Sequence, residues 1–247
     1  GFENLLAAEG LTPQRLADVT QKLADARAAL DDAAAEKCAA CVTFYPEGYA
    51  RLAVPAFAAL HGEFQRRVLA RLLGLIAPAD YPPGQALIDR LRSDICRKDF
   101  QGRTGFGCDF SPEGPAGDVL VVREAAALPA PQPLSGAGHM VWDGRFMLDR
   151  LPQTAHESLH LQALGAAGVA ALRKQAAGDK KILAALGALP GKVRAGLPSV
   201  WQGEKLLSVP HLSWHDAAAG AALSGVAATF PALGDSVCAG EDCFGGA

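Results

Sequence analysis

The feature that most constrains the fold is a Pro- and Gly-rich stretch in the middle of the chain, residues 127–138 (ALPAPQPLSGAG). This composition is typical of a linker between domains. A chain of 247 residues and 25.6 kDa has room for two modest domains, each with its own hydrophobic core. We therefore predict two modules, residues 1–128 and residues 136–247.

Helical and strand patterns occur on both sides of this stretch. Thr12 and Pro13 form a helix start, and apolar residues keep helical spacing from there to about Cys41. A hairpin is predicted over residues 42–54, one helix over 57–76, another after Gly84, and two strands over 104–124. The second half combines strand patterns at 139–148 and 158–164, helical patterns at 168–175 and 182–197, and a hairpin at 205–214. The fold class expected is α+β, with a helix-rich first module carrying short hairpins and a smaller mixed α/β C-terminal module.

The charge is small overall but unevenly distributed. The net charge is -3 and half of the residues are hydrophobic, which excludes a disordered chain and a histone-like polycation. Residues 171–195 nevertheless carry six basic residues against one acidic residue, whereas residues 206–247 carry four acids and no base. Any nucleic acid would therefore have to be bound by a local basic surface.

The location is predicted to be cytoplasmic. The six cysteines do not form the dense framework of a small secreted domain, and no basic segment precedes an apolar stretch at the start of the chain. Residues 217–234 lack charge, but they consist largely of Ala, Gly, Ser and Thr and are too weakly apolar to span a membrane.

Two motifs suggest a metal, and each has a simpler explanation. His156 and His160 fit the H-E-x-x-H pattern of zinc hydrolases, but residues 158–164 alternate as in a strand, which would separate the two imidazoles by roughly 13 Å. Cys38 and Cys41 form a CxxC that Cys238 and Cys243 could complete, although its place at the end of an alanine-rich helix favours small buried thiols. The prediction is no metal ligand, and the zinc hydrolase stays a remote alternative.

No catalytic centre is visible in the sequence. The Gly-bearing loops lack the spacing of a phosphate-binding loop, and no G-x-S-x-G nucleophile turn occurs. What remains are basic residues on predicted helix faces and in loops, which could bind nucleic-acid phosphates through charge-assisted contacts. The candidate RNA-binding residues are Arg66, Arg67, Arg71, Arg92, Arg97, Lys98, Arg103, Arg145, Arg173, Lys174, Lys192 and Arg194.

Several stretches in order along the chain carry a family resemblance. They include residues 5–30, GYARL (48–52), RRVLARLL (66–73), DYPP (80–83), GFGCDF (105–110), VVRE (121–124), VWDGRF (141–146) and residues 197–214. Together they resemble the substrate-binding and C-terminal portion of bacterial tRNA(Ile)-lysidine synthetase. The resemblance implies a tRNA-processing ligase that uses ATP to join lysine to the anticodon cytidine of tRNA(Ile), forming lysidine.

The resemblance also implies a division of labour. The family's ATP-binding S-G-G-x-D-S turn has no match here, so ATP and Mg²⁺ are expected in an N-terminal domain that this sequence lacks. This chain would hold tRNA, would bind no cofactor itself, would contribute no catalytic residue and would be inactive alone. The alternative is a stand-alone, non-catalytic module that binds RNA or protein, and a homodimer is possible in either case.

Overall fold

The computed structural model describes residues 12–114, 117–134, 138–149, 159–217, 223 and 225–231. Within these residues, helices accompany two five-stranded antiparallel sheets and one three-stranded antiparallel sheet. The predicted α+β class is confirmed. No helix in this part of the chain is both long and apolar enough to cross a bilayer.

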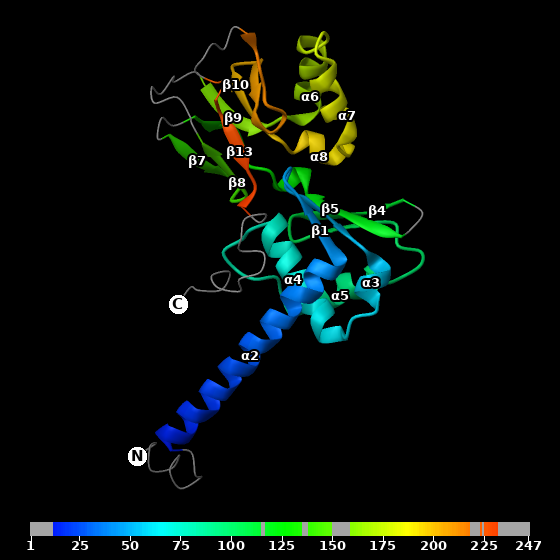
Figure 1. The fold of residues 1–247 in the computed structure, drawn as a ribbon, viewed down its shortest axis with the longest axis vertical. Helices are drawn as coiled ribbons and strands as arrows, with labels where there is room; N and C mark the ends of the chain where they lie inside the picture. Colours follow the sequence, from blue (N-terminus) through cyan, green and yellow to red (C-terminus); the bar gives the residue numbers. More distant parts are fainter. Residues whose placement is uncertain are drawn as a thin grey trace.

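The first element is a long helix, α2 (Pro13–Cys41), with the limits that the sequence predicts. Thr12 caps it, because its side-chain oxygen accepts a hydrogen bond from Arg15 N at 3.3 Å and Pro13 occupies the first helical position. The helix ends where Val42 turns to extended geometry and enters the first sheet. Most of α2 projects away from the rest of the protein (Figure 1).

The first sheet has the order β1-β2-β5-β4-β3. The predicted hairpin consists of β1 (Val42–Tyr45) and β2 (Tyr49–Leu52). Strands β3 (Arg103–Gly105), β4 (Cys108–Glu113) and β5 (Asp118–Arg123) complete the sheet. The central strand β5 is buried on both faces, with Val119 and Val121 in one core and Leu120 and Val122 in another, which accounts for its continuous apolar sequence.

Three helices cover the face of this sheet that carries Val119 and Val121. They are α3 (Val54–Ala58), α4 (Gly62–Ile76) and α5 (Gln85–Ile95). The prediction of one helix over 57–76 is wrong, because the chain leaves helical geometry after Ala58 and His61 starts a new helix by accepting from Glu63 N at 3.3 Å. Apolar side chains at helical spacing nevertheless form the core-facing side of α4. Leu69, Leu72 and Ile76 of α4 are fully buried.

The second sheet has the order β12-β11-β10-β9-β6. Its strands are β6 (Gln132–Pro133), β9 (Leu159–Ala163), β10 (Pro198–Gln202), β11 (Lys205–Val209) and β12 (Trp214–His215). β6 lies inside the stretch predicted to be a linker, so part of that stretch belongs to a sheet. The predicted 205–214 hairpin exists as β11 and β12, joined by the short helix η2 (Pro210–Leu212), but β11 also pairs with β10, which was not predicted.

Helices α6 (Gly165–Gln175), α7 (Lys180–Ala188) and α8 (Gly191–Ala195) lie beside the second sheet (Figure 1). The predicted helix over 182–197 is divided into α7 and α8 at Leu189 and Pro190. Gly168 allows α6 to approach β10 closely, since a Cβ there would lie 2.9 Å from Trp201 Cζ2.

A third, small sheet consists of β7 (His139–Trp142), β8 (Phe146–Asp149) and β13 (Ala227–Thr229). The short helix η1 (Ala125–Ala127) precedes it in the chain. Trp142, Phe146 and Leu148 are fully buried in the same core as Leu52 and Val121 of the first sheet. The residues on the two sides of the Pro- and Gly-rich stretch thus share a core, and the division into two modules stays a prediction.

Candidate nucleic-acid interface

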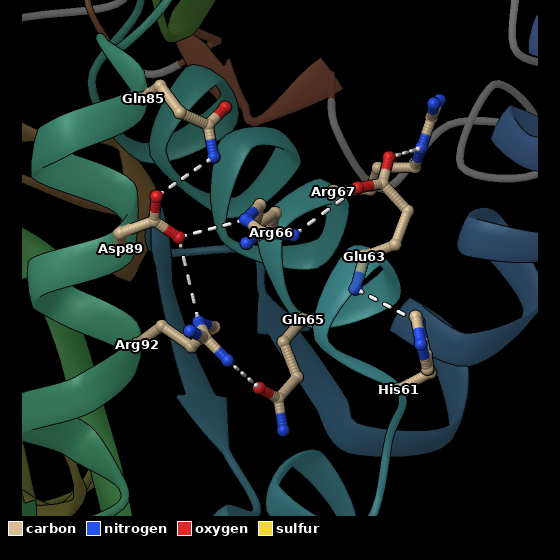
Figure 2. Close-up of polar contacts among 8 residues, drawn as sticks. All are labelled: His61, Glu63, Gln65, Arg66, Arg67, Gln85, Asp89 and Arg92. Carbon is tan, nitrogen blue, oxygen red and sulfur yellow. Dashed lines mark hydrogen bonds and ion pairs between the residues drawn. The ribbon is translucent and has the colours of Figure 1, made fainter.

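Three of the predicted RNA-binding arginines lie in one ion-pair network across α4 and α5. Arg66 donates to Asp89 Oδ1 at 2.8 Å, and Arg92 donates to Gln65 Oε1 at 3.3 Å. Both contacts join α4 to α5 (Figure 2). Arg66 also lies 3.6 Å from Glu63, and Arg92 lies 3.7 Å from Asp89. These guanidinium groups therefore join two helices as well as carrying positive charge.

Arg67 extends this network to the long helix. It donates to Glu63 Oε1 at 2.9 Å and makes a further close hydrogen bond to Asp31 of α2. The hydrogen bond from Arg66 lowers the pKa of Asp89, which keeps the carboxylate charged. Since these carboxylates neutralise much of the local positive charge, a phosphate could engage the arginines only by competing with them.

Two further arginines occupy the segment after α5. Arg97 makes a bidentate contact with Asp99, at 3.0 and 2.9 Å, and Arg103 is hydrogen-bonded to Asp94. Lys98 between them is exposed and makes no hydrogen bond or ion pair with the described residues. Lys98 is therefore the more accessible cation of this segment.

Arg71 and Arg145 differ in their surroundings from the exposed cations. Arg71 is half-buried on α4, close to Cys38. Burial raises the pKa of the Cys38 thiol to about 11, and the positive charge of Arg71 acts in the opposite direction. The Arg145 side chain is only 2% exposed, donates to Asp143 Oδ2 at 2.7 Å and to Gly48 O at 2.9 Å, and has its pKa lowered by burial. Arg145 is a buried packing residue, and we exclude it from the candidate surface.

Lys192 and Arg194 both lie on α8 but have structural partners. Lys192 Nζ donates to both carboxylate oxygens of Asp109 at 2.8 Å and to Ser111 Oγ at 2.7 Å, which joins α8 to β4. Arg194 donates to Leu189 O at 2.7 Å and to Gly187 O at 3.3 Å, so it satisfies carbonyls at the end of α7.

A cluster of four accessible cations surrounds the turn between α6 and α7. Arg173 and Lys174 lie in the last turn of α6, and Lys180 and Lys181 lie in the first turn of α7. All four are exposed and have no ion-pair partner among the described residues. The acid of this turn, Asp179, accepts hydrogen bonds from Lys181 N and Ile182 N, so it caps α7.

This cluster, which we call the α6–α7 basic turn (Arg173, Lys174, Lys180 and Lys181), lies at the end of the molecule opposite the start of α2 (Figure 1). The candidates chosen from the sequence include its first two residues and omit Lys180 and Lys181. The signal for the omitted pair was the basic excess of residues 171–195.

The two metal motifs do not assemble a site in the described part of the chain, where no group of three or more His, Cys, Asp and Glu could hold a metal. His160 lies on strand β9, so the predicted strand is confirmed there, and His156, Cys238 and Cys243 lie outside the described residues. Cys38 and Cys41 are buried at the end of α2, and burial raises the pKa of Cys41 to about 12.

The fold and this surface define an α+β protein with an exposed cluster of cations on its helices. Comparison with known proteins shows that the chain is similar to a tRNA(Ile)-lysidine synthase from Ruegeria pomeroyi, with 30% identity over 205 residues. The match covers 83% of this chain and 44% of the relative, so the chain spans less than half the length of that enzyme. No family model matches the chain. The resemblance predicted from the sequence is confirmed by this homologue.

Proposed function

We propose that this chain binds tRNA as the tRNA-holding part of a tRNA(Ile)-lysidine synthetase. The observation that carries the proposal is the similarity over 205 residues to the R. pomeroyi enzyme, whose name specifies tRNA(Ile). The two predicted modules, residues 1–128 and 136–247, would both contribute to holding the tRNA in the cytoplasm. The lysine-joining reaction and its ATP are assigned no residue of this chain, because the sequence holds no phosphate-binding motif.

The α6–α7 basic turn supports this role because its four cations are exposed and are paired with no carboxylate in the part of the chain that the structure describes. Binding of RNA there would release counterions at little cost in broken ion pairs. Lys98 offers a further cation of the same kind. The carboxylate-paired residues contribute less, since each must exchange a protein partner for a phosphate. These residues are Arg66, Arg67, Arg92, Arg97, Arg103 and Lys192.

The test compares two variants that remove the same charge. One carries Arg173→Ala with Lys174→Ala, and the control carries Lys22→Ala with Lys37→Ala on the acidic helix α2. Affinity for a tRNA(Ile) transcript with a CAU anticodon is measured by fluorescence anisotropy over a range of salt concentrations. We expect the first variant to lose affinity and to reduce the slope of log K against log salt by about two, one for each phosphate contact.

The control variant should keep the parent slope because α2 carries five acidic residues beside its four basic ones. Equal slopes for both variants and the parent would remove the α6–α7 basic turn from the interface. A parent chain with no salt-sensitive affinity for tRNA would contradict the tRNA-binding proposal and favour the stand-alone protein-interaction module.

A further inference from the structure

A line of apolar side chains is exposed along the first two-thirds of α2. Every residue from Thr12 to Leu30 is exposed, and the exposed fractions include 45% for Leu16, 54% for Val19 and 66% for Leu23. Leu30 is 37% exposed and closes the line. Exposed leucines that recur on one face of a helix mark a surface that gains free energy when it is covered.

The spacing of this line follows that of a coiled-coil seam. Leu16, Val19, Leu23, Ala26 and Leu30 are separated alternately by three and four residues. This repeat places them on one side of the helix over two heptads, with leucine at each a position and Val19 and Ala26 at the d positions. We call these five residues the α2 stripe.

The body of the protein holds the stripe in a fixed direction. The last part of α2 is anchored, because Ala34, Cys38 and Cys41 are buried and Asp31 is hydrogen-bonded to Arg67 of α4. Leu30 immediately precedes this anchor, and the rest of the stripe extends along the projecting part of α2 (Figure 1). A partner would therefore meet a preformed helix and would not have to order it.

Of the five positions that flank the stripe, three are basic and none is acidic, since the other two are Thr20 and Ala29. At 3.6 residues per turn, Arg15 and Lys22 occupy the positions on one side, and Arg27 lies on the other side, where it also contacts Asp31 at 3.7 Å. The acids occupy the opposite face, where Asp18 and Asp25 accept hydrogen bonds from Gln14 and Gln21 at 3.0 and 2.8 Å.

This charge pattern indicates which kind of partner could cover the α2 stripe. In a homodimer, parallel or antiparallel, the flanking positions would place cations of one copy against cations of the other, which disfavours pairing. RNA and anionic membranes are disfavoured because α2 as a whole carries five acids and four bases. A partner helix that carries acidic residues beside its apolar seam would complement this surface instead.

We propose that the α2 stripe is a docking site for an amphipathic helix of another protein, one that carries acidic residues beside its own apolar seam. Leucines of the two helices would interdigitate, while Arg15, Lys22 and Arg27 would face carboxylates of the partner. The inference does not depend on the α6–α7 basic turn, which lies at the other end of the molecule (Figure 1).

The test uses the full chain and two synthetic helical peptides of about 28 residues, long enough for stable helices. Both peptides carry leucine at the seam, and their flanking positions are all Glu in one and all Lys in the other. Fluorescence anisotropy should show the Glu peptide binding about tenfold tighter than the Lys peptide at low salt. Leu23→Glu should abolish binding of both, whereas the matched control Gln21→Glu on the opposite face should leave it unchanged.

A charge-swapped variant, Lys22→Glu with Arg27→Glu, should reverse the preference and bind the Lys peptide more tightly. All substituted side chains are exposed, so circular dichroism should report an unchanged fold. Equal affinity for both peptides, or binding of neither, would overturn the proposal. A dimer of the unmodified chain in light scattering that Leu23→Glu dissociates would assign the stripe to a second copy and would also overturn it.

Discussion

Gly168 controls how closely α6 approaches the second sheet, and its substitution by alanine tests that contact. A Cβ at this position would lie 2.6 Å from Leu164 Cδ1 and 2.9 Å from Trp201 Cζ2. The leucine methyl can rotate away, but the indole is held in place, because Trp201 Nε1 donates to Ser199 Oγ at 2.8 Å and the side chain is buried. The new methyl group therefore forces the helix or the ring to move.

The expected cost follows from two opposing effects. Overpacking of a core contact costs about 1 to 3 kcal/mol, and two contacts below 3.0 Å place this site near the upper end. Alanine favours the helix over glycine by up to about 1 kcal/mol. We expect Gly168→Ala to lower the free energy of unfolding by about 2 kcal/mol, or the melting temperature by about 4 to 8 °C.

The matched control is Gly187→Ala in α7, where a Cβ would meet no atom within 4 Å. This variant should be more stable than the parent by about 0.5 to 1 kcal/mol, since only the helix propensity changes. Urea denaturation followed by far-ultraviolet circular dichroism gives both values if the slope m is unchanged. In a Trp201→Phe background the cost of Gly168→Ala should fall by about 1 kcal/mol. A Gly168→Ala variant as stable as Gly187→Ala would refute the reasoning.

Two further variants test buried polar groups. His211 Nε2 lies 2.9 Å from Pro46 O, and burial lowers the pKa of His211 to about 4, below its unfolded value near 6.5. The unfolded state therefore takes up the proton first, so this contribution to stability is present above pH 6.5 and is lost as the pH falls toward 4, by up to about 3 kcal/mol. His211→Gln should flatten the denaturation profile over that window. Arg145→Ala removes one of the two arginine partners of the Asp143 carboxylate, which is only 3% exposed. Thermal unfolding should show that the free energy of unfolding falls by about 3 to 5 kcal/mol, because a buried charge loses its partner. A decrease below about 1 kcal/mol would show that the pair is not buried in solution.

The elements that the sequence predicts well are those fixed by local signals. Helix α2 begins at Pro13 because Thr12 and Pro13 specify a start, and β9 could be distinguished from a zinc-binding helix by the alternation of its side chains. The error over 57–76 has a physical reason. Apolar residues keep helical spacing from Phe57 to Ile76, across the break between α3 and α4, so periodicity alone does not reveal the break. The pairing of β6 with β9 joins segments far apart in sequence, which no local pattern encodes.

The candidate interface was predictable only as a set of charges. Arg67 and Asp31 are 36 residues apart, and Lys192 and Asp109 are 83 residues apart, so their pairing depends on the tertiary fold. Arg145 shows the same limit, because its basic side chain was taken as a surface residue and is buried against Gly48. Counting basic residues overestimates a binding surface wherever the fold supplies carboxylates to neutralise them.

The four cations of the α6–α7 basic turn remain accessible, and residues 171–195 around them hold a single acid, Asp179, which caps α7. The sequence predicts the helical spacing of the α2 stripe, and the fold leaves this stripe exposed because only the last turns of α2 reach the body. The two surfaces lie at opposite ends of the molecule (Figure 1). They share no side chain, so substitutions in one should leave binding at the other unchanged, and a variant carrying both should show the sum of the separate free-energy changes.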